Sequence, residues 1–119
     1  MFTIVLDTNI ILDSIKFRID LFTELRRICS FPYKIAVLDK TLKELENKKN
    51  SKIAFQLINK KNIQIIKTQD SYVDDLLFKL NDEHIIATND KELKRRLRKE
   101  NKKIITIRQK KYLMTENVL

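Results

Sequence analysis

The amino-acid sequence predicts an α/β protein in which a parallel sheet lies between two layers of helices. Apolar runs of strand length recur along the 119 residues, and segments with apolar residues at helical spacing separate them. Two of these runs lead into aspartates, Asp7 and Asp90, and a helical pattern follows each aspartate. Strands that alternate with helices pair in parallel and are covered on both faces. We therefore expect a three-layer α/β/α arrangement with five parallel strands.

The expected elements follow from these patterns in chain order. Strands are predicted at 2–6, 34–38, 63–66, 84–88 and 104–107. Helices are predicted after Asp7 with a break near 15–19, from Asp20 to a stop at 30–32, over 41–60 with a polar interruption at 47–52, over 72–81, and from 91 to about 100. The segment after Arg108 shows no clear period. The chain is thus expected to form a single domain over 1–119, with 108–119 as a basic C-terminal tail.

Residue types that are rare or absent exclude several kinds of site. The chain has no glycine, which excludes phosphate-binding loops and dinucleotide-binding fingerprints. One cysteine and one histidine exclude a disulfide framework, a thiolate zinc site and a histidine-rich metal site. Turns must then rely chiefly on asparagines near the expected helix ends, namely Asn47, Asn50, Asn59, Asn62, Asn81, Asn89 and Asn101.

The apolar runs are short. None of them reaches the length of a membrane span or of a signal-peptide core. We therefore expect a cytoplasmic protein without a membrane partner.

Positive charge is concentrated towards the C-terminus. Residues 91–111 hold eleven Lys or Arg and two Glu, an excess that equals the net charge of the whole chain, +9. In a helix that buries Leu93 and Leu97, the outer face carries four cations that we expect no acid to neutralise: Lys91, Lys94, Arg95 and Arg98. A charge run is often only a solvated surface. The position of this one beside Asp90 favours a surface that binds nucleic acid.

Four acidic residues stand where expected helices begin: Asp7, Glu44, Asp74 and Asp90. Each one alone fits a capping role, because 41–44 and 71–74 have capping-box spacing and both remaining aspartates fit N-caps. The four carboxylates can also meet in one crevice, since the carboxyl ends of parallel strands share one edge of the sheet. Carboxylates without histidine or cysteine form a hard-oxygen site, which suits Mg²⁺ or Mn²⁺ rather than zinc.

Taken together, these residues resemble the PIN-domain nuclease family. The resemblance spans nearly the whole chain and is carried by four segments: 7–9 (DTN), 44–46 (ELE), 74–77 (DDLL) and 87–93 (ATNDKEL). The last two look most like the branch that includes archaeal and eukaryotic nucleases of small-subunit ribosomal RNA processing. The resemblance implies a sheet of order 3-2-1-4-5, with Asp7 and Asp90 beside its switch point.

The resemblance also implies an activity, Mg²⁺- or Mn²⁺-dependent endonucleolytic cleavage of single-stranded RNA. It implies catalytic and metal-binding roles for the four acids, Asp7, Glu44, Asp74 and Asp90, with Asp75 as the alternative to Asp74. Asn9 and Thr88 match polar positions that support the site. The residues expected to bind the RNA backbone are Lys91, Lys94, Arg95, Arg98 and Arg108.

Three functions are compatible with this sequence. The first is an endoribonuclease that processes ribosomal RNA, with single-stranded or pre-ribosomal RNA as its partner. The second is the toxin ribonuclease of a toxin–antitoxin pair, in which an antitoxin covers the acidic crevice. The third is a catalytically idle RNA-binding or scaffold domain, against which the intact set of acids argues. A homodimer is a further hypothesis about partners.

Overall fold

Six strands form one sheet in the computed structural model, which describes residues 1–68 and 73–118 and, at Asp74, the backbone alone. The strands are β1 (Phe2–Leu6), β2 (Tyr33–Leu38), β3 (Gln64–Ile66), β4 (His84–Ala87), β5 (Ile104–Arg108) and β6 (Tyr112–Glu116). Their order is β3-β2-β1-β4-β5-β6; β1 to β5 pair in parallel, and β6 pairs antiparallel with β5. The predicted order 3-2-1-4-5 is therefore confirmed, within a mixed sheet.

The helices connect these strands much as the apolar spacing predicts. They are α1 (Thr8–Lys16), α2 (Leu21–Ile28), α3 (Asp39–Leu45), α4 (Ser51–Lys60), α5 (Val73–Phe78) and α6 (Lys91–Lys99). The predicted break near 15–19 separates α1 from α2, and the polar interruption at 47–52 separates α3 from α4. The predicted helix over 72–81 is shorter in the structure, and Tyr72 lies outside the described residues. Within the described ranges, no helix has the length and apolar character that crossing a membrane requires.

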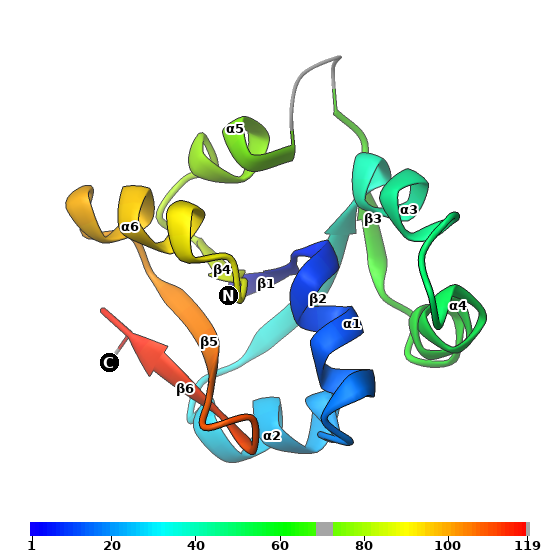
Figure 1. The fold of residues 1–119 in the computed structure, drawn as a ribbon. Helices are drawn as coiled ribbons and strands as arrows, with labels where there is room; N and C mark the ends of the chain where they lie inside the picture. Colours follow the sequence, from blue (N-terminus) through cyan, green and yellow to red (C-terminus); the bar gives the residue numbers. More distant parts are fainter. Residues whose placement is uncertain (69–72, 119) are drawn as a thin grey trace.

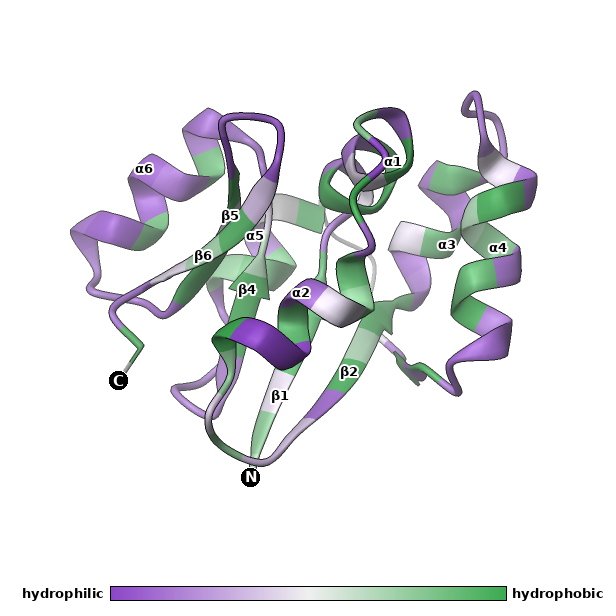
Figure 2. Cartoon of the chain, turned by 90° about the horizontal axis from the view of Figure 1, so that it is seen from below, coloured by the Kyte–Doolittle hydropathy of each residue, from purple (hydrophilic) through white to green (hydrophobic). Residues whose placement is uncertain are grey.

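Alternate strand residues face opposite sides of the sheet and create two apolar cores. Ile4 and Leu6 pack in one cluster with buried residues of α1, α2 and α4, whereas Val5 packs in another with buried residues of α5 and α6. Figure 1 shows these helices on the two sides of the sheet, and Figure 2 shows the apolar strands between more hydrophilic helix surfaces. The period of two in the strands therefore produces the three predicted layers.

Asparagine occupies turn positions that glycine often takes in other proteins. Asn50, Asn62 and Asn101 have φ angles of 69°, 53° and 53°, in the left-handed region. Asn62 and Asn101 directly follow the C-caps of α4 and α6, where a left-handed residue allows the last carbonyls of a helix to find donors. Asparagine tolerates this region better than most residues do. The predicted use of asparagine at helix ends is confirmed at these positions.

The strand β6 is the element that the sequence did not predict. It lies within the expected tail and pairs with β5 through a tight turn, in which Lys111 N–H donates to the Arg108 carbonyl at 3.0 Å. The two central residues, Gln109 and Lys110, have φ of 53° and 55°. Such turns usually carry Asn-Gly or Asp-Gly, so this hairpin lacks the usual sequence signal.

Side chains of α2 hold β6 in place. The Leu113 N–H donates to Glu24 Oε1 at 2.9 Å, and Arg27 Nη2 donates to the Leu113 carbonyl at 2.7 Å. Arg27 Nε also donates to Glu24 Oε2 at 2.9 Å. The hydrogen bond from Arg27, supported by the one from Leu113 N–H, holds the pKa of Glu24 below its ordinary value. Because Leu113 is fully buried, water does not replace these partners.

We expect Glu24→Ala to lower the free energy of unfolding by about 1–3 kcal/mol, because it leaves the buried Leu113 N–H without its acceptor. A carboxylate with a lowered folded-state pKa contributes stability that is complete above the ordinary Glu value of 4.5 and is lost as pH falls through the folded-state pKa. The difference between wild type and variant should therefore shrink in acid. Urea unfolding at neutral and at acidic pH measures it.

Glu92→Ala is the matched control, because Glu92 pairs with Arg95 on the exposed surface of α6. It should have no measurable effect on stability, since exposed ion pairs contribute little. Equal losses in both variants would show that Glu24 does not hold β6.

Candidate active site at the carboxyl ends of β1 and β4

The order in which the chain adds strands to the sheet reverses direction between β1 and β4. From β1 the chain passes to β2 and β3 on one side, and β4, β5 and β6 lie on the other. At such a switch point the connections diverge and leave a crevice beyond the carboxyl ends of the strands. Here the structure has a cavity of about 380 Å³. Its lining includes three of the predicted acids together with four other residues: Asp7, Glu44, Asp90, Thr8, Asn9, Leu12 and Lys48.

Asp7 follows β1 directly and is only 4% exposed. Its Oδ1 accepts from the Thr8 N–H at 2.8 Å at the start of α1, and its Oδ2 accepts from the Thr88 hydroxyl at 2.8 Å. Two donors from neighbouring strand ends therefore fix this carboxylate. The predicted capping position is confirmed, since Asp7 is the N-cap of α1, and the same side chain also borders the cavity.

Asp90 is the N-cap of α6, and its Oδ1 accepts from the Leu93 N–H at 2.8 Å. Its own N–H donates to the Thr88 hydroxyl at 3.1 Å. The Thr88 oxygen thus lies between Asp7 and the backbone of Asp90 and fixes their relative positions. This contact agrees with the prediction that Thr88 is a polar residue that supports the site.

Asn9 ties α1 to the loop that precedes α6. Its Oδ1 accepts from the Asn89 N–H at 2.8 Å and lies 3.3 Å from the Thr88 hydroxyl. Asn89 Nδ2 in turn donates to Asp13 Oδ2 at 2.7 Å. Sequence reasoning missed Asp13, although its position one helical turn after Asn9 places both on the same face of α1. The result is a rigid polar connection between the two strand ends.

Glu44 reaches the cavity from α3 and accepts a 2.5 Å hydrogen bond from the Thr8 hydroxyl at Oε1. The capping box expected over 41–44 is wrong. The helix α3 already begins at Asp39, which places Thr41 inside it, fully buried.

Asp39, the first residue of α3, accepts hydrogen bonds from the backbone N–H and the hydroxyl of Thr68, at 3.2 and 2.6 Å. The hydrogen bond from the Thr68 hydroxyl is the main reason why the pKa of Asp39 is lowered.

Of the two adjacent acids of α5, Asp74 and Asp75, the structure describes the side chain of Asp75 alone. The side chain of Asp74 and the residue Ser71 of its expected capping box lie outside the described part, so the role of Asp74 stays a prediction. Asp75, the alternative, accepts from Arg96 Nη2 of α6 at 3.1 Å and does not border the cavity. The Arg96 guanidinium also lies 4.8 Å from the centre of the Phe78 ring. Asp75 therefore joins α5 to α6.

The donor set of the cavity suits a hard divalent cation. Among the described residues, no three Asp, Glu, His or Cys side chains group closely enough to enclose a metal ion on their own. Mg²⁺ does not need such a cage, because it commonly keeps several waters and binds one or two carboxylates together with substrate phosphates. Asp7 and Asp90, which both line the cavity, fit this mode of binding.

The outer face of α6 is more neutralised than the sequence suggested, and the expectation that no acid would neutralise its cations is wrong. Arg95 pairs with Glu92 one turn earlier, and Arg98 pairs with Glu116 of β6 at 2.7 Å. Lys94 is half-buried and donates to the Thr106 hydroxyl at 3.0 Å. Burial and, secondarily, the charge of Arg98 lower the pKa of Lys94. Two other residues that are predicted to bind the RNA backbone, Lys91 and Arg108, are exposed.

Comparison with known proteins agrees with this geometry. A family model described as a PIN like domain matches residues 4–110. Ribonuclease VapC4 of Methanocaldococcus jannaschii is 32% identical over 124 aligned residues, which cover 94% of this chain and 95% of that protein. The solved structure of the PIN domain endonuclease Utp24 superposes with a TM-score of 0.84, at 24% identity, over 98% of this chain and 92% of that one. The predicted family is confirmed, and the chain belongs to the PIN-like domain family.

Proposed function

We propose that this protein is a metal-dependent endoribonuclease. The observation that carries the proposal is the convergence of Asp7, Glu44 and Asp90 on one cavity at the switch point of the sheet. Membership of the PIN-like domain family supports it, as does similarity to a protein named a ribonuclease and to another described as an endonuclease.

Asp7 and Asp90 would hold Mg²⁺ or Mn²⁺, with Asp74 as a third ligand and Glu44 as ligand to a second ion, directly or through water. Such an ion, when bound, polarises the scissile phosphate and lowers the pKa of a coordinated water. The Thr88 hydroxyl orients Asp7, and the Thr8 hydroxyl orients Glu44. Hydrogen bonds of this kind orient the side chains that would bind the metal.

Two biological roles remain proposals for this activity, both in the cytoplasm. In ribosomal RNA processing, the partner is pre-ribosomal or other single-stranded RNA. In a toxin–antitoxin pair, an antitoxin covers the acidic cavity and the ribonuclease acts when it is released. A small antitoxin gene beside the gene for this chain would favour the second role. A homodimer is compatible with either role.

Labelled single-stranded RNA, incubated with the protein and Mg²⁺, Mn²⁺ or EDTA, tests the activity. We expect the RNA to be cut at internal positions with either cation and to stay uncut in EDTA. Uncut RNA in all three conditions would favour the idle RNA-binding domain, and cleavage that survives EDTA would exclude the metal-dependent mechanism.

A further inference from the structure

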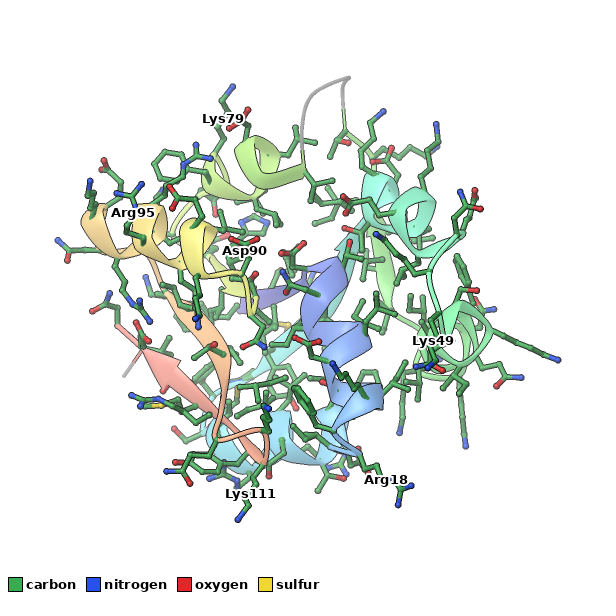
Figure 3. The ribbon with its side chains drawn as sticks, viewed as in Figure 1. Arg18, Lys49, Lys79, Asp90, Arg95 and Lys111 are labelled. Atoms are coloured by element: carbon green, nitrogen blue, oxygen red, sulfur yellow. The ribbon has the colours of Figure 1, made fainter. Side chains whose placement is uncertain are left out.

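A second cavity adjoins the one that holds the acids. Its volume is about 350 Å³, and it is lined by Leu12, Asp13, Lys16, Lys48, Lys49 and Asn50. Leu12 and Lys48 line both cavities. The two hollows are therefore neighbours, one at the carboxylates and the other lined by residues of α1 and of the turn that joins α3 to α4. We call these two neighbouring hollows together the path. Figure 3 shows Asp90 at the start of α6 and Lys49 beside α4, with α1 between them in this view.

The backbone of this turn is fixed at both of its ends. The Lys48 N–H donates to the Leu45 carbonyl at 3.1 Å, and the Ser51 N–H donates to the Lys48 carbonyl at 3.2 Å. Asn50 closes the turn with φ of 69°, immediately before α4. The position of Lys48 relative to Glu44 is thus set by helix ends rather than by a long loop.

The lysines of the path keep their charge available. Lys48 and Lys49 are exposed, and within 1–68 and 73–118 neither forms an ion pair. Asp13 is the acid among the residues that line the second cavity, and its carboxylate is engaged by the side-chain amide of Asn89. The cavity of the acids thus has Lys48 at its rim, and the neighbouring cavity has three lysines, Lys16, Lys48 and Lys49, against the one acid Asp13. The cations on α6 differ, because Arg95 and Arg98 are already paired with Glu92 and Glu116.

This arrangement matches the charge of an RNA strand whose backbone lies across α1. Three carboxylates repel an approaching phosphate, and a cation at their rim reduces that repulsion. We propose that Lys48 positions the RNA phosphate that adjoins the scissile one, and that Lys16 and Lys49 hold the strand beyond it. The inference rests on the proposed ribonuclease function and assigns the course of its substrate. Lys48 acts here as a phosphate-positioning residue.

The test compares Lys48→Ala, Lys48→Arg and the double variant Lys16→Ala/Lys49→Ala with wild type. Lys34→Ala is the matched control, because Lys34 is an exposed lysine near the amino end of β2, at the opposite edge of the sheet. The probe is a fluorescein-labelled single-stranded RNA of mixed sequence. Anisotropy at several salt concentrations, without added metal, measures binding, and steady-state cleavage with Mn²⁺ measures kcat and KM.

We expect Lys48→Ala to raise KM for cleavage by about 10-fold, the effect of losing one charged hydrogen bond to phosphate. The slope of log affinity against log salt should fall by roughly 0.7 for each phosphate contact removed. Lys48→Arg should retain most of the wild-type affinity for RNA. The double variant Lys16→Ala/Lys49→Ala should lower the slope of log affinity against log salt further than Lys48→Ala does. Lys34→Ala should match wild type.

The outcomes for the substrate path and for the activity can be told apart. RNA cleavage with unchanged KM and salt slope in Lys48→Ala would overturn the path while leaving the ribonuclease proposal intact. RNA binding that depends on Lys48 without any cleavage would support the path and overturn the ribonuclease. A wild-type protein that binds no RNA would overturn both.

Discussion

Asp90→Asn is expected to lower the rate of metal-dependent RNA cleavage by more than about 100-fold and to leave the fold intact. Replacement of groups that only support a metal ligand already costs roughly 10–100-fold, and Asp90 would be a ligand itself. Asparagine can replace aspartate as an N-cap at little cost, so the hydrogen bond from the Leu93 N–H should survive. Cleavage assays with Mn²⁺ and urea unfolding of the same preparation measure the two effects.

Asp82→Asn is the control for Asp90→Asn. Asp82 is an exposed acid just before β4, at the opposite end of that strand, and its replacement removes the same charge away from the cavity. Calorimetric titration with Mn²⁺ adds a readout besides activity, in which Asp90→Asn should weaken binding and Asp82→Asn should not. A fully active Asp90→Asn variant would show that the metal site lies elsewhere.

The second large effect is expected at α5, where Asp74→Asn should reduce cleavage far more than Asp75→Asn does, again by more than about 100-fold. Adjacent residues of a helix differ in direction by about 100°, so only one of the two acids can face the cavity. Asp75 already pairs with Arg96. In the sequence, the spacing of Asp74 to Leu77 matches the acid of the PIN-domain family, and this resemblance favours Asp74 as the ligand.

Parallel measurements on the two α5 variants separate catalysis from packing. Asp75→Asn should retain cleavage close to wild type, with at most a small loss of stability from its partly exposed ion pair. Asp74→Asn should retain stability and lose Mn²⁺ affinity. The opposite ranking would assign the ligand role to Asp75 and would require its pair with Arg96 to open when metal binds.

The candidate site could be located from the sequence because its position follows from local patterns. Asp7 and Asp90 each follow a short apolar run and precede a helix, and such residues in a parallel sheet necessarily lie at its carboxyl edge. Lys48 could not be found in this way. It lies in a turn between two helices, and only the packing of α3 and α4 beside α1 brings it to the rim of the cavity.

The charged face of α6 shows the same limit. Helical spacing places Arg95 and Arg98 on the side of α6 away from Leu93 and Leu97, and both are exposed. Lys94 was predicted on that face as well, but it is half-buried and donates to the Thr106 hydroxyl. The sequence does not reveal that Glu116 reaches Arg98, since these residues are 18 positions apart and meet only through β6. Surface charge depends on the tertiary neighbours of each cation as well as on its own helix.

The sequence by itself determined the α/β class and the positions of Asp7 and Asp90 after strands, since periods of two and 3.6 and residues at strand ends are local properties. The strand order β3-β2-β1-β4-β5, which the structure confirms, was implied by the resemblance to the PIN-domain family rather than by any local period. Only the tertiary structure decided the antiparallel β6, the anchoring of Leu113 by Glu24 and Arg27, and the position of Lys48 beside the acids of the cavity. The physical reason is that these features depend on contacts between residues distant in the chain, which no local period encodes.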